Sequence, residues 1–164
     1  MDKFSGKIWI LGDDIDTDII IPTEYLALKT VEDMAPYAFS PLRPELAAQI
    51  REGDILVAGK NFGCGSSREQ APEIIKELGI KCVIAKSFAR IFFRNSINNG
   101  LLLIENDKLQ ADVKEGDEIA VVLNEAIEYQ GNRYPITSLP ENLVDILNAG
   151  GLVKAMQKRN ALKV

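Results

Sequence analysis

Residues Ile55 to Ile104 read ILVAGKNFGCGSSREQAPEIIKELGIKCVIAKSFARIFFRNSINNGLLLI and carry the clearest signal of the fold class. Short apolar runs typical of buried strands alternate here with longer segments of helical periodicity. We expect strands at 55–59, 83–86 and 101–104, and helices at 69–78 and 89–98. Gly79 and Gly100 follow the two helical segments, a common position for glycine at a helix end. Strand, helix, strand, helix, strand indicates a parallel sheet.

The flanking segments extend this pattern. The region 23–44 contains several prolines and lacks clean periodicity, so we expect a loop with short helices there. Gln130-Gly131-Asn132 lies between two short strand-like runs and predicts a hairpin. Further strands are expected at 7–11, 118–123, 126–129 and 133–136, and further helices at 44–50, 140–148 and 152–158. We predict a single α/β domain over residues 1–164, with a mostly parallel central sheet and an added antiparallel β section.

Composition restricts the possible functions. Hydrophobic residues make up 46% of the 164 residues, which is enough for a substantial core. No apolar run approaches the roughly 20 residues of a membrane span, and residues 1–6 lack the apolar stretch of a secretory signal. We therefore expect a cytoplasmic protein. The net charge of −5 argues against a general nucleic-acid binder.

The chain contains no histidine, which excludes Ser-His-Asp and Cys-His machinery and any histidine metal site within it. Its two cysteines, Cys64 and Cys82, are too few for an iron–sulfur cluster or a four-thiolate zinc site, so we expect no metal bound by this chain. We expect both thiols to be reduced. Cys82 begins an apolar run and is interpreted as core, whereas Cys64 lies in a glycine-rich loop without a neighbouring base.

That loop, Asn61 to Glu69, is the candidate site. Gly63 and Gly65 permit unusual backbone geometry, and the serines and arginine that follow suit a carboxylate or phosphate at a helix start. The alternative is that Ser66 and Glu69 form a simple capping box. Pro72 predicts that the helix begins irregularly or later than Ser66. Arg68 favours a function, because a cation at a helix N-terminus is unfavourable unless an anion lies near.

An acidic segment follows the first strand. Its aspartates at 13, 14, 16 and 18 lack the downstream glycine and glutamate of a calcium-binding EF-hand loop. The structural interpretation is a turn in which aspartate side chains hold backbone amides.

Three separated segments together resemble the swivelling β/β/α domain of the aconitase superfamily. They are Asp13–Pro22, the Gly63–Glu69 loop, and Ala85–Ile91 with Asn99–Leu102. The length is similar to that of the free-standing small subunits of isopropylmalate and homoaconitate hydro-lyases. The resemblance implies a [4Fe–4S] cluster in a separate large subunit, which is the expected partner, and a small-molecule substrate, 2- or 3-isopropylmalate, in leucine biosynthesis.

The resemblance also implies roles for individual residues. Ser66 would be the base that exchanges a hydrogen with substrate carbon, and Arg68 would stabilise its alkoxide and clamp a carboxylate. Ser67 would donate to the same carboxylate. Thr17 and Asp18 would line the cleft, where Asp18 could orient an arginine. Arg90 and Arg94 are interpreted as ion-pair or interface residues.

Substrate choice is assigned by the same resemblance to the segment after Pro22. Leu26, Ala27 and Leu28 would line an apolar pocket for an isopropyl group, because related enzymes that hold an extra carboxylate carry an arginine where this chain has Ala27. Lys29 keeps homoaconitase or dual specificity open as an alternative. A second alternative, from another class, is a module that binds an anion at Gly63–Arg68 without chemistry.

Overall fold

The structure, a computed structural model, describes residues 3–162 of the chain, with side chains as far as residue 160. All described strands belong to one seven-stranded sheet with the order β4-β3-β2-β1-β5-β6-β7. The strands are β1 (Lys3–Ile10), β2 (Ile55–Ala58), β3 (Cys82–Ala85), β4 (Leu102–Glu105), β5 (Glu118–Val122), β6 (Ala126–Tyr129) and β7 (Asn132–Pro135). The predicted α/β class, with a parallel part and an added antiparallel section, is confirmed.

Strand β1 joins the two parts of the sheet. Its end, Ile8–Ile10, pairs in parallel with Ile55–Val57 of β2, and its beginning, Lys3–Lys7, pairs antiparallel with β5. The sequence predicted this strand only from residue 7, because the preceding residues are mostly polar. Pairing with β5 extends the strand through them, so tertiary contacts override the local pattern.

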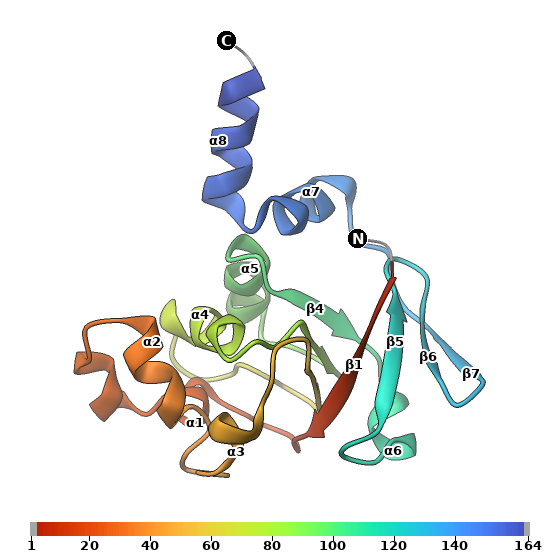
Figure 1. Cartoon of the computed structure of the whole chain (residues 1–164), viewed down its shortest axis with the longest axis horizontal. Helices are drawn as coiled ribbons and strands as arrows, with labels where there is room; N and C mark the ends of the chain where they lie inside the picture. The colour runs from red at the N-terminus through yellow and green to blue at the C-terminus, as the bar shows by residue number, and fades with distance from the viewer. Residues whose placement is uncertain (1–2, 163–164) are drawn as a thin grey trace.

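The helices are mostly short. Figure 1 shows α1 to α5 gathered on one side of β1, while α6 and β5–β7 lie on the other, and α8 extends away from the body. The helices are α1 (Thr17–Ile20), α2 (Val31–Met34), α3 (Leu46–Gln49), α4 (Gln70–Glu77), α5 (Arg90–Asn98), α6 (Leu109–Asp112), α7 (Glu141–Ala149) and α8 (Leu152–Leu162), with 3-10 turns η1 (Thr23–Ala27) and η2 (Ala35–Tyr37). Helices α4 and α5 are the crossovers predicted between the parallel strands, and short helices occur within 23–44 as expected.

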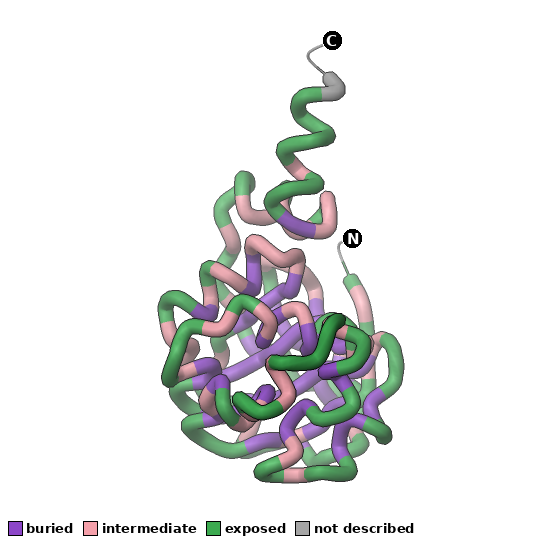
Figure 2. The backbone as a smooth tube through the Cα atoms, turned by 90° about the vertical axis from the view of Figure 1, so that its left-hand side faces the viewer, coloured by how far each residue is buried: buried purple, intermediate pink, exposed green. Residues whose placement is uncertain are grey.

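Two hydrophobic clusters pack on opposite faces of the sheet. Successive residues of β2 alternate between them: Leu56 and Ala58 face α4 and the 31–50 region, whereas Ile55 and Val57 face the other side. The second cluster is completed by apolar residues of β5, β6 and β7. Figure 2 shows the buried backbone concentrated at the centre of the body, while α8 is largely exposed. No helix within residues 3–162 combines the length and apolar character needed to cross a membrane.

Candidate active site

The candidate site forms where two loops leave the sheet side by side. The 59–69 loop follows β2, and the 86–89 loop follows β3, so both start at the carboxyl ends of parallel strands. The amide of Phe62 donates to the Ser87 carbonyl (3.0 Å), and the amide of Ala89 donates to the Phe62 carbonyl (3.0 Å). Ligands of open α/β sheets bind at this edge.

A glycine sets the path of the first loop. Gly63 has φ +82° and donates its amide to the Ile15 carbonyl at 2.7 Å. A Cβ atom at this position would overlap the ring of Phe92 on α5. The position therefore requires glycine both for its backbone conformation and for the close approach of α5.

Thr17, on α1, connects the N-terminal segment to the 59–69 loop through two hydrogen bonds. Its amide donates to the Cys64 carbonyl (2.9 Å), and its hydroxyl donates to the Ser66 carbonyl (2.7 Å). Thr17 is buried, with 2% of its surface exposed. Thr17 thus fixes the backbone that carries Ser66.

Ser66 does not cap a helix. Helix α4 begins only at Gln70, its N-cap residue is Glu69, and no side chain caps it. The capping-box interpretation is therefore wrong, and the predicted late start of the helix is confirmed. Ser66 and Ser67 are exposed, and neither side chain forms a hydrogen bond to any residue in 3–162. Because both hydroxyls are exposed and no described residue is bonded to them, both are available to a ligand.

The two serines open onto a cavity of about 230 Å³. The 59–69 loop forms one side of this cavity, which is polar, and the start of α5 forms the other side. The lining residues are Thr17, Gly63, Gly65, Ser66, Ser67, Arg68, Ala89, Arg90, Ile91, Phe92 and Asn95. The volume is below the roughly 300–1,000 Å³ of a typical small-molecule site.

Arg68 is held in place by three groups from one segment. Its guanidinium donates to the Ile21 carbonyl (2.7 Å) and the Thr23 hydroxyl (2.8 Å), and it forms an ion pair with Asp18. The Arg68 side chain is 12% exposed, whereas that of Asp18 is 64% exposed. Asp18 thus pairs with an arginine, as predicted. A guanidinium has five N–H donors, so some remain for a ligand.

Two of the remaining aspartates of this segment, Asp13 and Asp16, accept hydrogen bonds from backbone amides. The Asp13 carboxylate accepts from the Lys60 amide (2.8 Å), and that of Asp16 accepts from the Ile19 amide (2.9 Å) and caps α1. The structural interpretation is correct for these two residues. Within residues 3–162, no three Cys, Asp or Glu side chains gather as a metal site would require.

The segment Leu26–Lys29 does not line the cavity. Leu26 packs on the first hydrophobic cluster, and the next three residues are exposed. The adjacent Tyr25 stacks on Tyr37 with ring centres 4.1 Å apart, which holds η1 against the 31–37 region. Thr23, which precedes this segment, does reach the site, because its hydroxyl accepts a hydrogen bond from Arg68.

Both cysteines are free thiols. Cys82 is fully buried in β3, so its interpretation as a core residue is confirmed. Burial raises the pKa of the Cys64 thiol, and the nearby carboxylates of Asp16 and Asp14 raise it further. The Cys64 environment therefore opposes the thiolate that a nucleophile needs.

Arg90 and Ile91 are the residues that sequence reasoning missed. The sequence interprets Arg90 as an ion-pair or interface residue. It forms no salt bridge within the described part of the chain, so the ion pair is not found, and it lines the cavity. Ile91 also lines it, with 60% of its surface exposed. A signal was present: the helix they begin follows β3, and the carboxyl ends of adjacent parallel strands meet at one edge.

Comparison with known proteins places this arrangement in a class. Residues 24–109 match the model of the aconitase C-terminal domain, so the fold and loop define an aconitase-type domain. The chain is 80% identical to the 3-isopropylmalate dehydratase small subunit of Lachnospira eligens over 98% of each chain. It is 49% identical to 3-isopropylmalate dehydratase small subunit 1 of Archaeoglobus fulgidus, over 91% of this chain and 94% of that one.

A solved structure agrees with this assignment. The crystal structure of 3-isopropylmalate dehydratase from Methanocaldococcus jannaschii matches with a TM-score of 0.92 and 41% identity, covering 98% of this chain and 97% of that one. The chain belongs to the family of 3-isopropylmalate dehydratase small subunits.

Proposed function

We propose that this chain is the small subunit of a two-chain hydro-lyase that interconverts 2- and 3-isopropylmalate by removing water and adding it back the other way. The observation that carries the proposal is the exposed Ser66 hydroxyl at a cavity, on a loop fixed by Thr17 and beside Arg68. None of the described residues forms a hydrogen bond with this hydroxyl. The names of the relatives support the substrate, because those described above are 3-isopropylmalate dehydratase small subunits.

Ser66 is the proposed base. In the dehydration step its oxygen, as the alkoxide, takes the proton from the carbon next to a carboxylate, and the C–H electron pair forms the new double bond. The C–O bond on the adjacent carbon then breaks, and the hydroxyl leaves. Rehydration reverses both steps with the two carbons exchanged. A [4Fe–4S] cluster held by the large subunit would supply Lewis acidity toward the departing hydroxyl.

The chain offers two cations for the two carboxylates of a malate derivative. Arg68, held by Asp18 and Thr23, is a fixed charge beside Ser66 that stabilises its alkoxide and the charge that develops on the nearer carboxylate. Ser67 donates to the same carboxylate. Arg90 lines the other side of the cavity without a salt bridge in the described chain, so we assign it to the second carboxylate.

The apolar side of the cavity suits the isopropyl group. Ala89, Ile91 and Phe92 contribute this side, and burying a branched alkyl group there is favourable by roughly 2 kcal/mol. The segment Leu26–Lys29 remains a proposed contact of the variable group, on the side that the partner would close. Because the cavity is small and its serines are exposed, we propose that the large subunit provides the remaining walls.

Reconstitution tests the proposal. The purified chain is mixed anaerobically with its cognate large subunit, and the isomerisation of isopropylmalate, homoaconitate and citrate is compared. We expect turnover only when both chains are present, with isopropylmalate preferred. No gain over the large subunit alone would reject the proposal. Tight carboxylate binding by the isolated chain, without association, would instead favour the non-catalytic anion module.

A further inference from the structure

A second and larger cavity lies at the opposite edge of the parallel strands. It has a volume of about 490 Å³, within the range of small-molecule sites. Lys81 immediately precedes β3 and Leu102 begins β4, so this cavity is at the amino ends of strands whose carboxyl ends carry the Ser66 loop. The two cavities share no lining residue.

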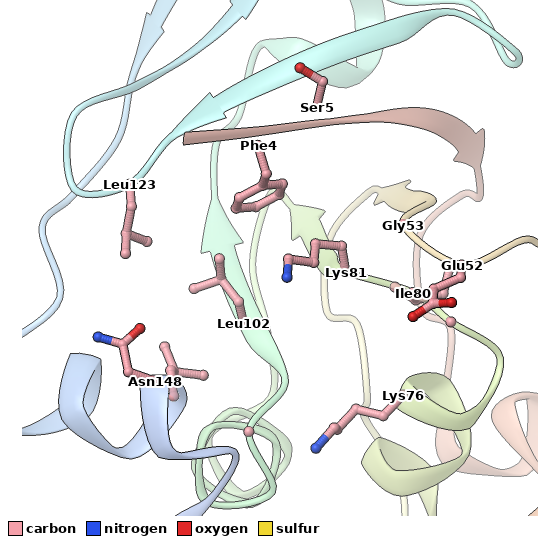
Figure 3. Close-up of a pocket in the computed structure, with 13 residues that line it drawn as sticks. Phe4, Ser5, Glu52, Gly53, Lys76, Ile80, Lys81, Leu102, Leu123 and Asn148 are labelled. Carbon is pink, nitrogen blue, oxygen red and sulfur yellow. The ribbon is translucent and has the colours of Figure 1, made fainter. Parts of the chain in front are cut away.

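One wall of this cavity is apolar and comes from both the sheet and α7. Phe4 of β1, Leu123 after β5 and Leu147 of α7 are each only partly buried against the second hydrophobic cluster. Leu102 completes the wall, and Figure 3 shows its side chain between those of Phe4 and Asn148. An alkyl chain placed here would bury surface that the folded chain leaves accessible.

Two lysines also line this cavity, Lys76 and Lys81. The Lys81 ammonium lies 5.7 Å from the centre of the Phe4 ring and forms no salt bridge within the described residues. Figure 3 shows it directed into the space between Phe4 and Leu102. The Lys76 ammonium donates to the Asn99 carbonyl at 2.8 Å. Partial burial and the nearby Lys154 lower the pKa of Lys76, so an added anion would relieve this positive surface.

We propose that this cavity binds a short-chain monocarboxylate, with its carboxylate on Lys81 and its alkyl chain against Phe4, Leu102 and Leu147. Glu52, the one acidic side chain among the described lining residues, disfavours a second negative charge on the ligand. The ligand would bridge α7 and the sheet. Binding would therefore stabilise the folded chain and does not depend on the proposed catalytic function.

Sodium hexanoate is the probe, titrated into the full chain at constant ionic strength. Hexanamide keeps the alkyl chain without the charge, and acetate keeps the charge without the chain. Calorimetry should show saturable hexanoate binding at least tenfold tighter than either control, with a matching rise in the thermal midpoint. Equal binding of hexanamide, or no saturation, would overturn the proposal.

Variants localise the binding. Lys81→Gln should weaken hexanoate at least tenfold and remove its advantage over hexanamide, while Lys81→Arg should keep most of it. Lys114→Gln, an exposed lysine outside the cavity, should change nothing. Ser66→Ala should bind hexanoate normally even if it is inactive, which separates this test from that of the proposed function. Unchanged affinity in Lys81→Gln would contradict the assignment.

Discussion

Single residues decide whether the 59–69 loop can form. Gly63 requires a left-handed backbone and has the Phe92 ring against its Cα, so it is constrained in two ways. Gly116 has a similar φ of +94° but nothing within 4 Å of an added Cβ. Comparing alanine substitutions at the two positions separates the free-energy cost of backbone strain from the cost of steric overlap.

Gly63→Ala should therefore lower the free energy of unfolding by about 3 kcal/mol, the sum of backbone strain and overpacking. Gly116→Ala should lose only about 1 kcal/mol, because backbone strain acts alone. Urea denaturation followed by circular dichroism measures both. Equal losses for the two variants would show that contact with Phe92 does not constrain the loop.

The Cys64 thiol should react slowly despite its place beside the serines. Its pKa is raised by burial and by Asp16 and Asp14, so the thiolate fraction at neutral pH is smaller than that of an ordinary cysteine. The rate of reaction with a disulfide reagent should keep rising above pH 9.0, the ordinary value for the thiol. Cys82 should react only on unfolding. Rapid modification of Cys64 at pH 7 would contradict this description of the loop.

At the scale of elements, a salt bridge ties the two parts of the sheet to the 31–50 region. Arg43 contacts both carboxylate oxygens of Glu115 (2.6 and 3.2 Å), and the amide of Ile10 donates to the same carboxylate (3.0 Å). The hydrogen bond with Arg43 lowers the pKa of Glu115, and that of Arg43 is raised in turn. The pair is partly exposed, so its contribution is modest.

Glu115→Gln should cost about 1 kcal/mol of unfolding free energy at pH 7. The folded pKa of Glu115 lies below the unfolded value, so this stability is present above the unfolded pKa, near 4.5, and is lost as pH falls through the folded pKa. The wild-type and variant unfolding curves should therefore converge in acid. A difference that persists unchanged at pH 3 would mean that the charge of Glu115 is not its cause.

Sequence predicted the elements best where local pattern and tertiary packing agree. The apolar runs of β2, β3 and β4 fall on buried strands within one residue at either end, and the 130–131 turn joins β6 to β7 as expected. The first half of β1 was missed because its polar residues become a strand only through β5. Likewise, the position of Arg90 at the cavity follows from the pairing of β2 with β3 and not from the local pattern of the helix that Arg90 begins.

At the scale of the molecule, the exposed apolar rim of the first cavity is the expected contact with the large subunit. Ile91 is 60% exposed there. A charge at this position would be desolvated on assembly, so Ile91→Asp should weaken association with the large subunit at least tenfold. Leu42→Asp, at a residue 47% exposed elsewhere, is the matched control and should assemble normally. Equal effects of both variants would argue against this rim as the interface.

The most direct measurement is the turnover of isopropylmalate by the reconstituted enzyme carrying Ser66→Ala, at saturating small subunit. We expect a loss of at least about 100-fold, the usual effect of removing a general base, with unchanged association. Ser40→Ala, a serine outside the site, should keep full activity. A Ser66→Ala enzyme that assembles normally and turns over at the wild-type rate would contradict the claim that this chain supplies the base.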